Sequence, residues 1–249
     1  MTTAESNYPD SYYLHTANSI KDRPQLTESI DADVCIIGGG YTGLLAALNL
    51  AEKKNRVVLL EANKIGWGAS GRNGGQIGSG HNKKIDQLEK DYGKSLAREL
   101  WNLSEHAKEI VKDRITDHQI NCDLRHGNMT VSNNPRDDAE HRRYVEKLNK
   151  DYDYDSVRYV DQEEVYDIFH SPFFKGGGSM DRGGMHLHPL NYALGLADAA
   201  ERQGVEIYEN SRVLNYSKGS ISQISTDHGK VRAKIVVLAC NAYLEKLEK

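Results

Sequence analysis

The spacing of hydrophobic residues changes between two periods along the chain and predicts an α/β protein. A short apolar run at residues 33–37 ends in glycine, and apolar residues then recur at helical spacing over residues 44–54. A second strand-like run follows at residues 56–60. This succession of strand, helix and strand has about the length, roughly 30 residues, that a βαβ unit requires.

The rest of the chain continues to alternate between helical and strand-like patterns. Steps of three and four between apolar residues predict a long amphipathic helix from Ile85 to about Ile115, with Gly93 as a kink. A hairpin or pair of short strands is expected at residues 122–132. The last strand is apolar on both faces from Ile235 onward, which predicts a buried parallel strand. Further helices are expected at residues 137–150, 161–169 and 189–202, and further strands at 205–208, 212–216, 220–226 and 230–239.

Composition narrows the class of protein. Hydrophobic residues make up 38% of the 249 residues, and the longest apolar runs are far shorter than the roughly 20 residues of a membrane helix. The first 13 residues lack the apolar core of a signal peptide, so we expect a cytoplasmic protein with no membrane partner. A net charge of −4 argues against a nucleic-acid partner. Three cysteines without C-x-x-C spacing indicate neither disulfides nor a metal site.

The first of two glycine clusters forms a dinucleotide-binding fingerprint. Residues 38–43 read Gly-Gly-Gly-Tyr-Thr-Gly, which is G-x-G-x-x-G between a strand and a helix. Its glycines permit a tight turn, close approach of a pyrophosphate, and packing of the helix on the strand. Glu61 ends the second strand, where a carboxylate accepts both hydroxyls of an adenosine ribose and disfavours the 2′-phosphate of NADP. The alternative is that Glu61 is a solvated acid at the end of a strand.

The second glycine cluster indicates which dinucleotide is expected. Residues 65–76 contain five glycines, at a place where an NAD-binding domain enters an ordinary helix. Such a loop exposes backbone amides to a larger, extended ligand. The alternative is a floppy surface loop, which would leave Trp67 and Ile77 exposed.

With these motifs, the chain resembles the D-amino-acid-oxidase-like FAD-dependent amine oxidoreductases, which include sarcosine and glycine oxidases. The run from Gly66 to Gln76, Gly-Trp-Gly-Ala-Ser-Gly-Arg-Asn-Gly-Gly-Gln, is the most specific part of this resemblance. Further similar stretches span nearly the whole chain, at residues 11–13, 17–18, 33–61, 184–196 and 236–243. The resemblance implies a Rossmann-like, three-layer FAD-binding domain of the glutathione-reductase type, with an inserted, incomplete α+β substrate domain.

The resemblance also implies how the chain is divided. Residues 1–29 would form an N-terminal extension, residues 30–118 and 188–249 the two parts of the FAD-binding domain, and residues 119–187 part of the substrate domain. Members of this family continue well beyond the strand at residues 236–239. We therefore expect this chain to be the N-terminal part of a longer enzyme.

A set of FAD-binding residues follows from the same resemblance. The fingerprint glycines would hold the pyrophosphate, Glu61 the ribose, and residues 69–76 the ribityl chain and the isoalloxazine edge. The backbone of Val213 would contact adenine, and Ala239 with Asn241 would form a turn that returns to the cofactor. The predicted residues are Gly38, Gly40, Tyr41, Thr42, Gly43, Glu61, Ala62, Gly68, Ala69, Ser70, Arg72, Asn73, Gly74, Gly75, Gln76, Val213, Ala239 and Asn241. Residues 69–76 contain neither His nor Cys, so we expect non-covalent FAD.

The implied reaction is oxidation of the primary amine of gamma-glutamylputrescine to an aldehyde, with release of ammonia and hydrogen peroxide, in putrescine catabolism. Oxygen or another acceptor would take the electrons. Arg72 is the candidate catalytic residue, as a charge beside the flavin, and a loop-anchoring salt bridge is its alternative role. Two other functions stay open: oxidation or dehydrogenation of another amine or amino acid, such as a D-amino acid, sarcosine or glycine, and an inactive FAD-binding fragment.

Several other side chains have plainer interpretations. His186 and His188 have the spacing of a metal pair but no third ligand nearby in sequence, so we expect a role at a helix start. Trp101 is expected in the core, with a substrate cage as the alternative. Tyr152 and Tyr154 stand among aspartates, where a solvated acidic turn is favoured over a site for an ammonium group.

Overall fold

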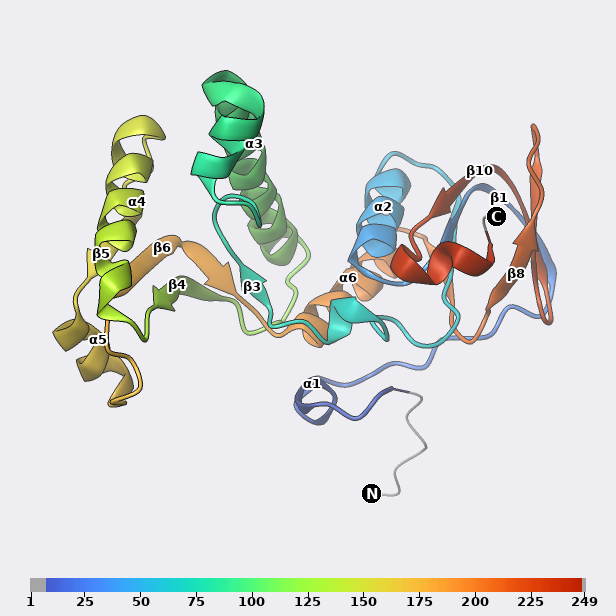
Figure 1. The fold of residues 1–249 in the computed structure, drawn as a ribbon. Coiled ribbons are helices and arrows are strands. Elements are labelled where there is room, and N and C mark those ends of the chain that lie inside the picture. The colour runs from blue at the N-terminus through green and yellow to red at the C-terminus, as the bar shows by residue number, and fades with distance from the viewer. Residues whose placement is uncertain (1–7, 248–249) are drawn as a thin grey trace. The chain divides into compact units, whose positions relative to one another are not determined.

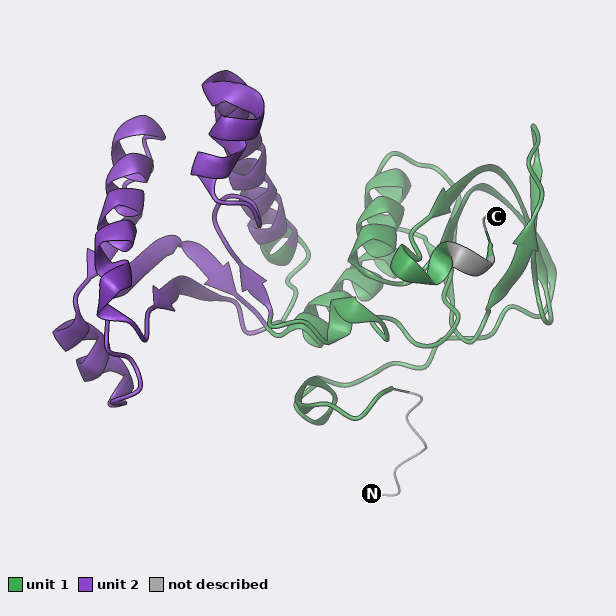
Figure 2. Ribbon diagram, viewed as in Figure 1, with its two compact units in different colours: residues 1–74, 115–122, 188–249 green, residues 75–114, 123–187 purple. Residues whose placement is uncertain are grey.

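The computed structural model describes residues 8–247, which fold into two compact units (Figures 1 and 2). Unit 1 comprises residues 1–74, 115–122 and 188–249, and unit 2 comprises residues 75–114 and 123–187. The first part of unit 1 ends at residue 74, whereas the expected segment 30–118 ends at residue 118. Most of the long third helix therefore belongs to unit 2. The assignment of these ranges to a cofactor domain and a substrate domain stays a prediction.

Unit 1 is built on a six-stranded sheet with the order β7-β2-β1-β10-β9-β8. The first four of these strands are parallel to one another, whereas β9 runs antiparallel to β10 and β8 antiparallel to β9. The predicted βαβ unit and the parallel direction of the last strand are confirmed. The strands are β1 (Ser29–Ile37), β2 (Val57–Leu60), β7 (Glu206–Tyr208), β8 (Val213–Tyr216), β9 (Ser222–Thr226) and β10 (Lys230–Leu238).

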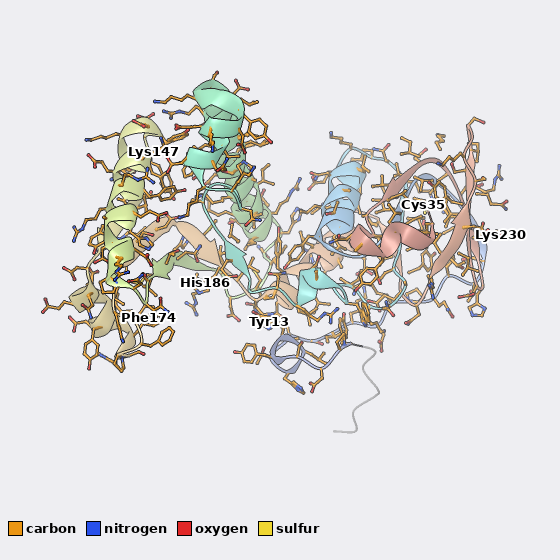
Figure 3. The ribbon with its side chains drawn as sticks, in the orientation of Figure 1. Tyr13, Cys35, Lys147, Phe174, His186 and Lys230 are labelled. Carbon is orange, nitrogen blue, oxygen red and sulfur yellow. The ribbon has the colours of Figure 1, made fainter. Side chains whose placement is uncertain are left out.

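The two faces of the parallel strands pack against different layers. Cys35 (labelled in Figure 3) and Ile37 lie in one buried cluster with side chains of β8, β9 and β10, among them Ile224. Ile36 points to the other face, where α2 (Tyr41–Glu52) packs on the sheet and on α6 (Pro189–Arg202). The helices α2 and α6 thus cover one face of the sheet, and side chains of β8 and β9 close a cluster on the other face. The predicted α/β fold class is confirmed.

The end of β10 differs from the expectation of a fully buried strand. Ile235 is 56% exposed, and the residues after it are only partly buried. In this half of the strand β9 no longer pairs with β10, and residues 235–238 pair with β1 alone. Val236 and Leu238 pack partly against the cluster that contains Cys35, on one face of the strand. The prediction of burial on both faces was wrong for this half of the strand.

Unit 2 has its own sheet, in which β6 (Gly178–His186) is the central strand. It pairs antiparallel with β4 (Arg125–Val131) on one side, and with β3 (Gln76–Ile77) and β5 (Val157–Val160) on the other. The expected hairpin at residues 122–132 is wrong. This segment is the single strand β4, with an irregular register beside Gly127, and its partner is a strand that the pattern did not predict.

The helices of unit 2 follow the predicted pattern more closely. They are α3 (Ile85–Asp117), α4 (Asp138–Asp151) and α5 (Gln162–Phe169). The kink at Gly93 is confirmed by its φ of 82°. The Asp161 carboxylate accepts the N–H of Glu164 at the start of α5, whereas the Glu164 carboxylate pairs with Arg158. Among residues 8–247, no helix is both long and apolar enough to cross a membrane.

Candidate cofactor site

The fingerprint loop in unit 1 has room only for glycine at its two ends. Gly38 adopts a φ of 114°, and a Cβ there would lie 2.5 Å from the carbonyl oxygen of Ala239. A Cβ on Gly43 would lie 1.9 Å from the carbonyl oxygen of Gly38. The loop therefore turns tightly between β1 and α2, as the fingerprint predicts. Gly40 is the N-cap of α2 and has no side chain to cap the helix, so the first backbone N–H groups of the helix need other acceptors.

Glu61 reaches this loop from the end of β2. Its carboxylate accepts the N–H of Gly39 at 2.6 Å and the N–H of Asn63 at 2.8 Å. Burial raises the pKa of Glu61 above its ordinary value, although the backbone N–H groups act in the opposite direction. Glu61 is partly buried and its carboxylate lies beside the loop, which does not agree with a freely solvated acid. Its role in binding a ribose stays a prediction.

The second glycine-rich loop closes on the first one. Ser70, in the 3₁₀ turn η1 (Ala69–Gly71), accepts the backbone N–H of Tyr41 at 3.0 Å and so caps α2 from another segment. The N–H of Gly66 donates to the carbonyl of Gly39 at 3.0 Å. Asn73 donates to two carbonyls of the same turn. The alternative of a floppy loop does not agree with these contacts.

Arg72 turns back onto its own loop. Its Nε donates to the carbonyl of Gly68 at 3.3 Å, and its guanidinium lies over the ring of Trp67, 5.2 Å from the centroid. These contacts anchor the loop through a backbone carbonyl and an aromatic ring. The alternative prediction for Arg72 was also a loop anchor, but through a salt bridge. A role for Arg72 in catalysis stays a prediction.

Two more segments of unit 1 reach the same end of the sheet. The N–H of Ser211 donates to the carbonyl of Glu61 at 2.8 Å, and Val213 follows as a buried residue at the start of β8. The N–H of Ala239 donates to the carbonyl of Ile37, next to Gly38. Asn241 adopts a φ of 49° at the start of η3 (Asn241–Lys246). The predicted adenine and return segments are thus neighbours of Glu61 and Gly38 respectively.

The remaining predicted residues have less specific surroundings. Thr42 lies in the first turn of α2, Ala62 and Ala69 are exposed, and Gly74 is the last residue of unit 1 before the chain enters unit 2. In unit 2, the carbonyl of Gly75 accepts the N–H of Leu187 at 3.0 Å. Gln76 pairs with His186 in the sheet of unit 2.

Sequence reasoning missed three residues that shape this site. Gly39 binds both Glu61 and Gly66, Ser211 binds the Glu61 carbonyl, and the fully buried Glu209 accepts the N–H of Ile65. The signal for Gly39 was its place inside the fingerprint. Nothing local marks Glu209, because its partner Ile65 is 144 residues away in sequence.

The other side chains singled out from the sequence lie elsewhere. His188 caps α6 by accepting the N–H of Asn191, as a helix-start histidine does, and His186 lies on β6 (Figure 3). Within the described residues, no three His, Cys, Asp or Glu side chains are grouped so that they would hold a metal ion. Trp101 is buried in the core of unit 2 against Tyr152 and Tyr154, so the prediction of a core residue is confirmed. The predicted solvated turn holds for Asp151, Asp153 and Asp155, which are exposed, but not for the two tyrosines between them.

The residues that are present fit a dinucleotide cofactor. Glycines stand where a Cβ would fill the loop, a helix N-terminus offers N–H groups and partial positive charge to phosphates, and a carboxylate stands beside them for a ribose. Comparison of the sequence with known families decides which class of dinucleotide protein this is. Residues 33–249 match the family described as FAD dependent oxidoreductase, DAO. The chain belongs to this family.

Individual relatives of these FAD-dependent oxidoreductases are similar along almost the whole chain. The gamma-glutamylputrescine oxidoreductase of Escherichia coli (strain K12) is 40% identical over 98% of this chain and 57% of its own length. The probable oxidoreductase OrdL of Haemophilus influenzae is 38% identical over 96% of this chain and 56% of its own length. The chain thus spans little more than half the length of the curated relatives that it matches.

Solved structures of similar fold include oxidases and deaminases of amino acids. Glycine oxidase from Geobacillus kaustophilus has a TM-score of 0.68 at 20% identity, over 87% of this chain and 57% of that protein. The L-amino acid deaminase of Proteus myxofaciens has a TM-score of 0.71 at 21% identity, over 92% of this chain and 49% of that protein. At these identities the similarity establishes the α/β fold alone.

Proposed function

We propose that this chain contains the FAD site of an oxidoreductase that oxidises the primary amine of gamma-glutamylputrescine. The observation that carries the cofactor part of the proposal is the closure of Glu61 and Ser70 on the loop at residues 38–43. The substrate part is supported by the 40% identity to the Escherichia coli protein that carries this substrate in its name. The coarser conclusion, an oxidoreductase of the FAD-dependent family, does not depend on the substrate.

In this proposal each segment of the site has a separate task. The N-terminus of α2 binds the pyrophosphate, because its N–H groups and the helix dipole favour an anion. Glu61 accepts the ribose hydroxyls, and the backbone near Val213 contacts adenine. Residues 69–76 face the ribityl chain and the flavin ring, with no His or Cys for covalent attachment.

The residues above would hold FAD, which would supply the two-electron oxidation of the carbon that bears the amine. Hydrolysis of the resulting imine by water would give the aldehyde and ammonia. The protein's own contribution is to bind and orient the reactants. Arg72 would place a positive charge at the flavin end of the site. Oxygen is the proposed final acceptor, with hydrogen peroxide as product, and a cytoplasmic location stays part of the proposal.

The test measures peroxide and ammonia released by the protein from the whole reading frame that contains these 249 residues. Gamma-glutamylputrescine is compared with putrescine, sarcosine, glycine and a D-amino acid as substrates. We expect the largest kcat/KM for gamma-glutamylputrescine. A higher value for glycine, sarcosine or the D-amino acid would contradict the proposed substrate, and turnover only with an artificial dye acceptor would contradict the proposed oxidase activity.

A further inference from the structure

A buried ionic cluster in unit 1 lies next to the predicted cofactor loops but is not explained by them. At its centre is Glu209, which is 0% exposed. Its carboxylate lies 3.0 Å from the Lys64 ammonium and 3.8 Å from the Arg23 guanidinium, and it accepts the N–H of Ile65 at 2.9 Å. A buried carboxylate is costly unless charges and hydrogen bonds compensate it. Two basic side chains and one backbone N–H therefore compensate the buried charge of the Glu209 carboxylate.

Ile65, whose N–H binds Glu209, is also bound through its carbonyl group. The hydroxyl of Tyr8 donates to the carbonyl of Ile65 at 2.6 Å, so two side chains bind both backbone groups of Ile65. Burial, and then the nearby Glu209 carboxylate, raise the pKa of Tyr8, which keeps its hydroxyl protonated as a donor. The position of Ile65 is thus specified by residues from opposite ends of the chain.

Ile65 in turn contacts the phosphate-binding loop directly. Its side chain is fully buried, and its Cδ1 lies 2.7 Å from the position that a Cβ on Gly39 would take. The next residue, Gly66, donates its N–H to the Gly39 carbonyl. Displacement of Ile65 would therefore release the middle of the fingerprint loop, including the residue whose N–H binds Glu61.

The N-terminal extension is fixed firmly enough to act as a support. Arg23 is buried and pairs with Asp198 at 2.8 Å and Glu201 at 3.1 Å, both on α6. The N–H of Glu209 donates to the carbonyl of Pro24 at 3.1 Å. These contacts tie the extension to α6 and to the segment after β7 at the same time.

We propose that the extension, residues 8–26, clamps the cofactor loops, and that Tyr8 and Glu209 are positioning residues for FAD that act through Ile65. This inference rests on the proposed FAD site. Tyr8→Phe is the most direct test, because it removes one hydroxyl and leaves the buried charges in place. Tyr12→Phe is the matched control, since Tyr12 lies on the same extension and is 73% exposed.

The experiment measures the FAD dissociation constant by flavin fluorescence and the amide hydrogen exchange of the apoprotein by mass spectrometry. Loss of one hydrogen bond predicts a roughly 2- to 12-fold higher dissociation constant for Tyr8→Phe and no change for Tyr12→Phe. Exchange should accelerate in the peptides that contain residues 38–43 and 64–66, and not throughout unit 1 as a purely structural role would require.

Each other outcome has a definite meaning. A wild-type protein that does not bind FAD refutes the proposed function and this inference with it. A wild-type protein that binds FAD, with equal dissociation constants for the two variants, overturns the clamp and leaves the proposed function standing. Faster exchange throughout unit 1 would also overturn it, because Tyr8 would then stabilise the fold as a whole.

Discussion

Replacement of Glu61 by alanine tests how the ribose end of the site is built. The carboxylate is the acceptor for the N–H groups of Gly39 and Asn63, so Glu61→Ala leaves both groups without this partner. The substitution also removes a carboxyl group whose pKa is raised mainly by burial, so that its negative charge is unfavourable in the folded protein. These two effects on folding oppose each other, and we expect the free energy of unfolding of the apoprotein to change by no more than about 1 kcal/mol.

The effect on cofactor binding is expected to be larger. Hydrogen bonds to a charged group contribute about 1.5–3 kcal/mol, which corresponds to a roughly 10- to 140-fold increase in the FAD dissociation constant. Flavin fluorescence titration measures this constant, and urea unfolding measures stability. Glu206→Ala is a suitable control, because Glu206 is an acid of the same unit that pairs with Arg56 at the start of β7.

The same carboxyl group also predicts a pH dependence. Because the folded protein raises the pKa of Glu61, it binds more protons than the unfolded chain between the ordinary value of 4.5 and the raised value. The contribution of Glu61 to apoprotein stability therefore decreases as the pH rises through this window, and FAD affinity decreases as the pH falls through it. If the FAD dissociation constant of Glu61→Ala lies within twofold of the wild-type value, Glu61 does not bind the ribose.

Three further changes test other parts of the structure. Ser70→Ala removes the acceptor for the N–H of Tyr41 and should cost about 1 kcal/mol in urea unfolding, and an unaltered midpoint would contradict the cap. Cys35 is buried, and burial raises its pKa to about 12. Alkylation of the folded protein should therefore label the half-buried Cys240 before Cys35, and equal labelling of both would contradict the burial of Cys35. Lys108→Met leaves Glu105 without its buried partner and should cost roughly 3 kcal/mol, and a loss below about 1 kcal/mol would contradict a structural role for this pair.

The sequence predicts those parts of the fold that depend on local pattern. The βαβ unit, the kink at Gly93 and the helix over residues 189–202 follow from apolar periodicity, glycine and proline. The strand β6 does not, because its sequence, Gly-Ser-Met-Asp-Arg-Gly-Gly-Met-His, has no apolar alternation. It becomes a strand because partners bind it on both sides, and such pairing is not visible in one segment.

The same distinction applies to the candidate site. The fingerprint glycines and Glu61 are predictable, since their chemistry depends on a fixed spacing after a strand. The cap that Ser70 provides for α2, and the support of Ile65 by Tyr8 and Glu209, join residues that are 29 to 144 positions apart. Only the folded chain brings these side chains to the fingerprint loop. Tyr8 and Glu209 had no predicted role, and Ser70 was predicted to contact the cofactor and not to cap a helix.

Titration of the purified 249-residue chain with FAD measures whether residues 38–43 and Glu61 bind the cofactor. We predict saturable one-to-one binding of FAD. ADP should compete with FAD because it contains the same pyrophosphate and ribose, whereas NADP should not compete because its 2′-phosphate would meet the Glu61 carboxylate. A chain that is folded by circular dichroism and shows no FAD binding would contradict the claim that residues 38–43 and Glu61 form a cofactor site.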